Sequence, residues 1–309
     1  RDASSHFLSR YSAHSGPKSR YLCGVNSTSS FIHSVICCFV FFFFPFASSA
    51  FLSASAFSAS ACVTMITGIG KDGFGDESLQ NFKESQMDTS SVLRFETHTG
   101  VAHIWVDGQG QNRISIVPGA NFQITPQDAI EQVNKLKDVS VLIAQCEIPQ
   151  EVTLAAFRTA QELGITTILN PAPYQPLTDD LLDLTDWLIP NEIEFAELDK
   201  SHREPNSDEV IASLRSKGRT IVTLGSEGAA LVTKEGHVKR FAANKVSAID
   251  TTGAGDCFIG AFAAALASGA SEESAVQFGI DCATKSVMRK GAQSSYPALN
   301  EINFSLISK

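Results

Sequence analysis

The sequence lacks any cluster of basic residues interleaved with aromatic ones, and its formal net charge is −9, from 24 Lys and Arg against 33 Asp and Glu. Nucleic acid is therefore not an expected partner, because binding to phosphate backbones requires concentrated positive charge. The seven cysteines show neither metal-ligand nor redox spacing. Cys146, Cys257 and Cys282 fall in apolar stretches, where we expect buried free thiols. This pattern favours a reducing compartment, the cytoplasm.

Two further absences narrow the function classes. The string G-x-x-x-x-G-K-[ST] does not occur, which excludes a P-loop nucleotide site. A clean apolar run of about twenty residues is also lacking, because Pro45 and the serines after it interrupt the Phe-rich stretch 31–46, so a membrane partner is not expected. The 309 residues suffice for one large α/β domain or two small ones.

Residues 1–64 differ in composition from the rest of the chain, since Ser, Phe and Ala dominate them. One interpretation is a targeting or anchoring segment. We favour a second, translated non-coding sequence, because pyrimidine-rich intron ends encode runs of phenylalanine. Sequencing the mature transcript distinguishes the two. On either interpretation we expect residues 1–64 to stay outside the fold and one domain to span 65–309.

Strands and helices alternate from Val139 onward. The predicted strands are 139–144, 165–169, 187–189 and 220–224, and the predicted helices are 149–163 and 191–198. Such alternation is typical of a parallel sheet covered by helices on both faces. Upstream, residues 98–117 alternate in the manner of a hairpin with a turn at 107–110.

Gly68, Gly70 and Gly73 match a dinucleotide G-x-G-x-x-G only weakly. No long apolar strand precedes them and no ribose-binding acid follows at the usual distance, so a tight strand-to-helix turn is the better interpretation.

Four polar or glycine positions, Glu147, Asn170, Asn191 and Gly225, each follow a predicted strand closely. Singly they are typical turn formers. Together they indicate a ligand-binding site, because the carboxyl ends of parallel strands converge on the ligand crevice of an open α/β sheet.

The stretch 250–256, D-T-T-G-A-G-D, runs into a helix that repeats Phe258, Phe262 and Leu266 at helical spacing. Its glycines allow a tight turn whose N–H groups, with the positive end of the helix dipole, would form an anion hole. A carboxylate beside such a hole would repel phosphate, so the presence of Asp256 there is explained if the reaction requires a base. The alternative is that Asp250 and Asp256 only cap the helix.

The string D-T-T-G-A-G-D-x-F-x-G-A resembles the C-terminal signature of the ribokinase (PfkB-type) family of carbohydrate kinases. Four other segments also resemble family motifs: the G-x-D-x-F-G segment at 70–75, N-P-A-P at 170–173, N-x-x-E at 191–194 and T-L-G-x-x-G at 223–228. The resemblance covers about 65–309. It implies a ribokinase-like three-layer α/β fold, a mostly parallel sheet with helices on both faces and a small β lid.

The implied activity is ATP-dependent phosphorylation of a sugar primary hydroxyl, with D-ribose as the first expected acceptor and fructokinase or adenosine kinase activity as alternatives. The resemblance also implies the cofactors ATP, Mg²⁺ and K⁺, and it is compatible with a homodimer. For catalysis and sugar binding it implies the base Asp256, the anion-hole residues Gly253, Ala254 and Gly255, and the sugar contact Glu147. For the nucleotide it implies Asn191, Thr223, Leu224, Gly225, Ser226, Glu227, Gly228, Gly255 and Ile280. For metals it implies Glu194 near Mg²⁺, and Asp250, Thr252, Ser286, Arg289, Gly291 and Ser295 around K⁺.

Family members begin with a strand that carries Asn and Asp for the sugar hydroxyls, followed by a G-G-x-x-x-N segment. Nothing in residues 1–64 resembles either one. We therefore expect an incomplete lid, an unpaired sheet edge and little ribose turnover. A non-catalytic product that keeps only the nucleotide half is the second hypothesis.

Overall fold

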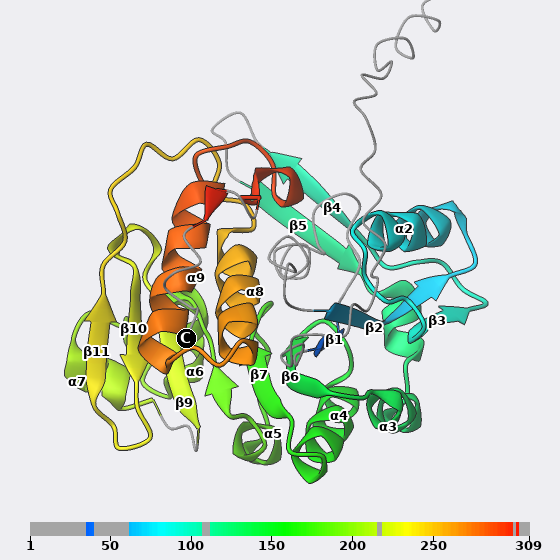
Figure 1. Cartoon of the computed structure of the whole chain (residues 1–309), viewed down its shortest axis with the longest axis horizontal. Coiled ribbons are helices and arrows are strands. Elements are labelled where there is room, and N and C mark those ends of the chain that lie inside the picture. Colours follow the sequence, from blue (N-terminus) through cyan, green and yellow to red (C-terminus); the bar gives the residue numbers. More distant parts are fainter. Residues whose placement is uncertain (1–34, 40–61, 107–111, 215–217, 299–300, 303–309) are drawn as a thin grey trace, which may run out of the picture. The chain divides into compact units, whose positions relative to one another are not determined.

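The computed structural model describes residues 35–39, 62–106, 112–214, 218–298 and 301–302. Within them the main sheet has the order β11-β10-β9-β8-β7-β6-β1-β2-β3 (Figure 1). Its strands are β1 (Val35–Phe39), β2 (Cys62–Gly70), β3 (Val92–Phe95), β6 (Val139–Gln145), β7 (Thr166–Asn170), β8 (Trp187–Leu188), β9 (Arg219–Thr223), β10 (Ala229–Val232) and β11 (Val238–Phe241). All neighbours pair parallel except β9–β10 and β10–β11, which are antiparallel.

Helices cover both faces of this sheet. They are α2 (Gly73–Glu84), α3 (Pro126–Lys135), α4 (Gln150–Glu162), α5 (Asp179–Asp183), α6 (Glu192–Leu198), α7 (Asp208–Ala212), α8 (Ala254–Ala267) and α9 (Glu272–Ser286), with the 3₁₀ turns η1 (Gly119–Gln123), η2 (Gly225–Glu227) and η3 (Gln293–Ser295). Helices α8 and α9 lie side by side on one face (Figure 1). Val141 and Ile143 pack into the core cluster of α8 and α9, whereas Leu142 and Ala144 pack into that of α3 and α4. This alternation along β6 confirms the predicted three layers.

Strand β1 lies inside the sheet, between β6 and β2, and pairs parallel with both. The expectation that residues 1–64 stay outside the fold is therefore wrong for Val35–Phe39, and also for β2, which begins at Cys62. Because β1 fills this place, the unpaired edge that we expected there is absent from the described sheet.

The elements predicted downstream are confirmed within one or two residues for β6, α4, β7, β8, α6 and β9. The predicted hairpin is also confirmed, as β4 (Val101–Val106) and β5 (Asn112–Val117) pair antiparallel in a separate two-stranded sheet. Its predicted turn at 107–110 lies outside the described residues. Among the helices of the described ranges, none combines the length and hydropathy needed to cross a bilayer.

Strand β2 has nine residues and contains both Gly68 and Gly70, so the expectation that no long strand precedes these glycines is wrong. The strand-to-helix turn itself is confirmed, because β2 ends at Gly70 and α2 begins at Gly73. Gly70 is required by close backbone approach, since a Cβ there would lie 2.3 Å from the backbone oxygen of Thr97.

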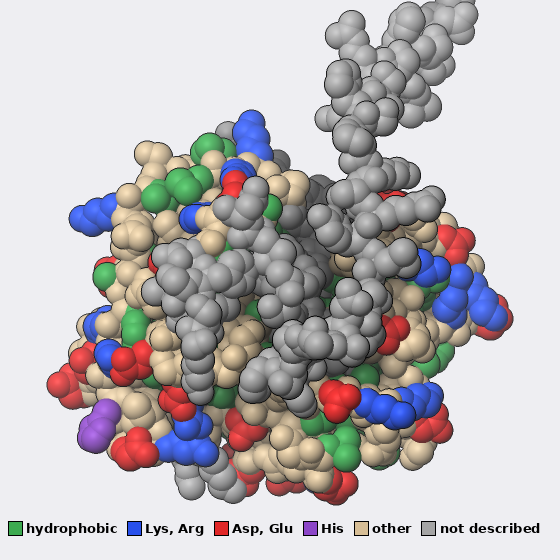
Figure 2. Space-filling view, viewed as in Figure 1, with side chains coloured by type: hydrophobic (Ala, Val, Ile, Leu, Met, Phe, Trp, Pro, Cys, Tyr) green, Lys and Arg blue, Asp and Glu red, His purple; other side chains and the backbone are tan. Residues whose placement is uncertain are grey.

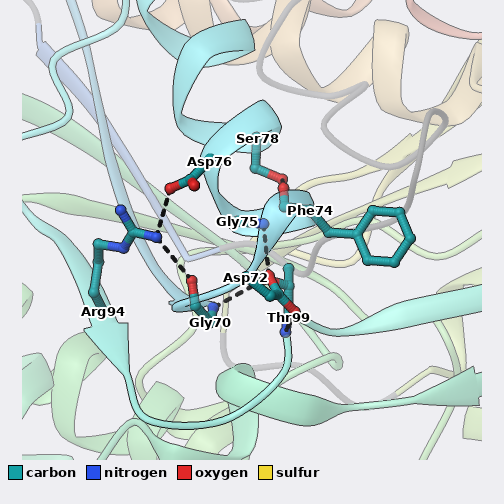
Figure 3. A network of polar contacts seen from close by, with 8 residues as sticks. All are labelled: Gly70, Asp72, Phe74, Gly75, Asp76, Ser78, Arg94 and Thr99. Atoms are coloured by element: carbon teal, nitrogen blue, oxygen red, sulfur yellow. Dashed lines mark hydrogen bonds and ion pairs between the residues drawn. The ribbon is translucent and has the colours of Figure 1, made fainter.

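The turn is held by the carboxylate of Asp72, the N-cap of α2 (Figure 3). This carboxylate accepts hydrogen bonds from Gly75 N at 2.8 Å, from Thr99 N at 2.8 Å and from Thr99 Oγ1 at 2.6 Å. Thr99 Oγ1 in turn accepts a bond from Gly70 N at 2.9 Å. Burial alone would raise the pKa of Asp72, but the bonds from Thr99 and Gly75 outweigh it and lower the pKa. Asp72 thus ties the start of α2 to the segment that enters β4.

Acidic and basic side chains lie interspersed over the described part of the face shown in Figure 2. This agrees with the sequence, which has no run of basic residues. On the described part of this face, charges of both signs are dispersed and do not form a concentrated positive patch.

Candidate active site

The turn before α8 is built on Gly253, the N-cap, which has φ +77°. A Cβ at this position would lie 2.7 Å from the hydroxyl of Tyr296, so both the backbone conformation and the packing require glycine. Downstream, α8 anchors in the core through Phe258 and Phe262, whose rings stack with centroids 6.1 Å apart. Asp256, in the first turn of α8, is thereby fixed at the helix end that carries positive partial charge.

A cavity of about 140 Å³ opens at this end of α8. Its lining residues come from the carboxyl ends of β7, β8 and β9 and from the α8 turn: Asn170, Ala172, Ile189, Asn191, Glu194, Thr223, Gly253, Gly255, Asp256 and Ile259. Seven of the ten were predicted at the site: Asn170 as a strand-end residue of the ligand crevice, and Asn191, Glu194, Thr223, Gly253, Gly255 and Asp256 with specific roles. The structure therefore brings the N-x-x-E segment and the α8 turn to one place.

Asn191 and Glu194 form a capping box at the start of α6. Asn191 Oδ1 accepts from Glu194 N at 2.8 Å, and Glu194 Oε2 accepts from Asn191 N at 2.9 Å. Glu194 is only 8% exposed. Burial raises its pKa to about 7, the Asn191 N–H opposes this rise, and the charge of Asp256 adds to it. A buried carboxylate facing a second acid suits a cation, and Mg²⁺ is commonly held by one or two carboxylates together with substrate phosphates.

The predicted nucleotide loop follows β9 as η2. Thr223 pairs with Asn191 through a parallel bridge, which joins the two predicted nucleotide segments. Gly225, Ser226 and Glu227 are exposed, and the loop closes through a bond from Leu224 N to Gly228 O at 2.8 Å. Gly228 has φ +103°, and a Cβ there would lie 2.0 Å from the backbone oxygen of Phe241. The loop is open to a ligand on one side and packed on the other.

The two segments predicted to surround K⁺ are joined by Asp250. Its Oδ1 accepts from Thr252 N at 3.0 Å and its Oδ2 accepts from Gly291 N at 2.9 Å. These bonds, that from Thr252 first, hold the pKa of Asp250 below its usual range.

The side chains of three other predicted K⁺ residues already have protein partners. Ser286 and Ser295 are 1% exposed, and their hydroxyls donate to Ala283 O and Ala292 O. The guanidinium of Arg289 is paired with Glu301, with Nη1 and Oε2 3.1 Å apart.

Three further predicted site residues lie outside the lining of the cavity. The N–H of Ala254 donates to Thr251 O at 3.2 Å, so this amide already has a backbone acceptor in the turn, and its part in the anion hole stays a prediction. The side chain of Ile280 is 3% exposed and belongs to the core around α8 and α9. Glu147 follows the carboxyl end of β6, at the edge of the sheet where the cavity lies, but it does not line the cavity.

Two strand-end residues lie beside Asp256 in the structure: Asn170, which sequence reasoning placed at the ligand crevice without a specific role, and Gln145, which it missed. Gln145 ends β6 and donates to Asp256 Oδ1, and Asn170 ends β7 and lines the cavity. Both follow apolar runs at predicted strand ends, and that position was the available signal.

The described residues combine a mostly parallel α/β sheet, an acid at a helix N-terminus and a buried second acid in the same cavity, an arrangement that suits the phosphotransferase class. Comparison with known proteins is consistent with this class. The model of the pfkB family carbohydrate kinases matches residues 51–299. The chain belongs to this family.

Individual relatives agree. The chain is 39% identical over 249 residues to a ribokinase of Staphylococcus aureus (79% of this chain, 82% of the relative). It is 35% identical over 250 residues to a deoxyribokinase of Salmonella typhi (78% and 80%). Among solved structures, the ribokinase of Thermotoga maritima superposes with a TM-score of 0.74 at 33% identity, covering 87% of this chain and 97% of the other.

Proposed function

We propose that this kinase transfers the γ-phosphoryl group of ATP to the primary hydroxyl of a pentose, with D-ribose giving D-ribose 5-phosphate. The observation that carries the proposal is the convergence of Asp256, Glu194 and Asn191 on one cavity at the N-terminus of α8. The ribokinase relative favours ribose, and the deoxyribokinase relative makes 2-deoxyribose the nearest competing acceptor. Fructose and adenosine remain further alternatives.

In the proposed reaction Asp256 takes the proton of the acceptor hydroxyl while the oxygen attacks the γ-phosphorus. The bond between that phosphorus and the bridging oxygen of ADP breaks, so the products are the sugar phosphate, ADP and a proton on Asp256. The positive end of α8, at Gly255, stabilises charge that develops on the phosphoryl oxygens.

Glu194 would hold Mg²⁺ together with the nucleotide phosphates, and the bound ion neutralises phosphate charge. We assign the base and ribose of ATP to the exposed η2 loop, next to Asn191, because this loop is open to solvent and joined to the cavity through Thr223. Glu147, at the end of β6, is the proposed contact for the sugar hydroxyls.

We also propose that K⁺ binds between the loops at 250–252 and 286–295. Support comes from Asp250, which already links the two loops, and from a set of ligands dominated by neutral backbone oxygens, which suits a large monovalent cation.

A homodimer through the β4–β5 hairpin is a further proposal, supported by the exposed Ile116 and Val117 on β5. Analytical ultracentrifugation tests the dimer.

A reducing compartment such as the cytoplasm fits the free thiols of Cys146, Cys257 and Cys282.

The test of function is ADP release from the full chain with ATP, Mg²⁺ and K⁺ across ribose, 2-deoxyribose, fructose and adenosine. Ribose is expected to give the highest kcat/KM, with a 5-phosphate product by ³¹P NMR. Asp256→Asn is expected to lower kcat by about 10² to 10⁴ while the nucleotide-induced rise in melting temperature is retained. A melting shift with ATP but no sugar-dependent ADP release would instead identify a nucleotide-binding product without kinase activity.

A further inference from the structure

Gln145 connects the end of β6 to the proposed base. Its side-chain amide nitrogen, Nε2, donates to Asp256 Oδ1 at 3.3 Å and to Asn170 Oδ1 at 3.2 Å. Asn170 Nδ2 donates in turn to the backbone oxygen of Ile189 at 2.9 Å. Three adjacent strand ends, those of β6, β7 and β8, therefore lead by hydrogen bonds to one carboxylate of α8.

The direction of this chain of bonds is fixed by chemistry. The backbone oxygen of Ile189 can only accept, so the side-chain NH₂ of Asn170 must face it. The oxygen of Asn170 then faces Gln145, which must present its own NH₂ group. That group has two hydrogens, one for Asn170 and one for Asp256. A donor therefore points at the carboxylate, and reversing the Gln145 amide would set its oxygen against two other oxygens.

Burial makes this arrangement costly to lose. Gln145 is 8% exposed and Asn170 is 6% exposed, so an amide N–H that lost its acceptor here could not hydrogen-bond to bulk water instead. A donor to a carboxylate also favours its ionised form, the form that can accept a proton.

We propose that Gln145 is a positioning residue for catalysis, which orients the carboxylate of Asp256, while Asn170 fixes the polarity of the Gln145 amide. This rests on the proposed function, in which Asp256 is the base. Gln145 itself does not line the cavity, so its effect on the reaction would pass through Asp256.

The test is Gln145→Met, which has similar length but no donor. We expect kcat to fall by about 10- to 100-fold, the KM for ATP to change less than about twofold, and the acid limb of the kcat–pH profile to move to higher pH. Gln145→Glu, with a carboxylate of nearly the same shape, should move that limb further because it sets a second negative charge beside Asp256. Gln175→Met is the matched control, since within the described part of the chain the amide of Gln175 bonds to Cys146, at its backbone oxygen 3.4 Å away and at its thiol, and not to Asp256. It should leave the profile unchanged.

Two measurements distinguish a positioning role from a merely structural one. In the Asp256→Asn background, Gln145→Met should add no further loss of kcat, because the two residues act through one step. Independently of turnover, ¹³C NMR of the Asp256 carboxyl, assigned by comparison with Asp256→Asn, should titrate at higher pH in Gln145→Met than in wild type.

An unchanged carboxyl titration and an unchanged acid limb in a folded variant would overturn the inference. If the wild-type chain had no sugar-dependent turnover, the proposed function would fail, and the carboxyl titration would still decide the role of Gln145. If Gln145→Met did not fold, the same two readouts in Gln145→Glu would decide it.

Discussion

The hydroxyl of Tyr296 donates a hydrogen bond to the backbone oxygen of Gly253 at 3.2 Å. This bond joins the C-terminal loop, which carries Gly291 and Ser295, to the turn that begins α8. Asp250 joins the same loop to the residues before the turn through Gly291 N. The proposed K⁺ site and the proposed phosphoryl site are thus parts of one connected structure.

Activity should therefore rise when K⁺ replaces Na⁺ at matched ionic strength, because an ion that holds the two loops together also holds Gly253 in place. Tyr296→Phe removes one bond of that connection. If the whole of this hydrogen bond, worth about 1 kcal/mol, helps to hold the turn in its reactive position, Tyr296→Phe should lower kcat by roughly fivefold. Steady-state rates in KCl and NaCl for both chains provide the measurement. Equal rates in the two salts for the wild type would contradict the K⁺ site.

Glu194 makes the stability of the ligand-free protein depend on pH. Because burial raises its folded-state pKa to about 7 from an ordinary value near 4.5, the native state binds more protons than the unfolded state between these values. The stabilising contribution is present below the ordinary value and is lost as pH rises through about 7. From pH 5 to pH 8 the wild type should lose about 2 kcal/mol more unfolding free energy than Glu194→Gln, which cannot ionise.

Urea denaturation at pH 5 and pH 8 without nucleotide or Mg²⁺ measures this difference. Glu197→Gln is the control, since Glu197 is an exposed acid on the same helix. Parallel pH dependences for wild type and Glu194→Gln would show that the buried carboxyl does not titrate in this range.

Asp72 should matter for stability more than any exposed acid of α2. Asp72→Ala removes the N-cap and three accepted hydrogen bonds, with an expected cost of about 2 to 3 kcal/mol in unfolding free energy. Amide hydrogens at the start of β4 should also exchange faster, because Thr99 loses its partner. Asp76→Ala is the control. Its exposed ion pair with Arg94 is worth about 1 kcal/mol or less. Equal losses in the two variants would refute the anchoring role.

The parts of the site that could be predicted from sequence depend on local signals. The α8 turn and the capping box of Asn191 and Glu194 each lie within a few residues, so spacing alone identifies them. The bond between Gln145 and Asp256 joins residues 111 apart, and it exists only because β6 lies next to β7 and beneath α8. No local pattern carries that information.

β1 escaped prediction for a related reason. Residues 35–39, V-I-C-C-F, are apolar without alternation, and such a run is compatible with a strand buried on both faces as well as with low-complexity sequence. Only the pairing with β2 and β6, which is non-local, decides between the two.

β1 offers no Asn or Asp for sugar hydroxyls, although it occupies an internal place in the sheet. Of the side chains proposed for the site, only Glu147 and Asp256 are assigned to the acceptor. A hydroxyl misplaced by about 1 Å can lower the rate about 10²-fold, so we expect weak ribose saturation and low kcat/KM for ribose beside an ordinary KM for ATP.

Replacing residues 1–61 with the corresponding segment of the Staphylococcus aureus ribokinase should therefore raise kcat/KM for ribose by about 10²-fold or more and leave the KM for ATP within about twofold. The measurement is initial-rate kinetics with each substrate varied. The same replacement in an Asp256→Asn chain should gain nothing, because positioning the sugar cannot restore a missing base. If the original chain already saturated with micromolar ribose, residues that serve the sugar hydroxyls would have to lie elsewhere in it.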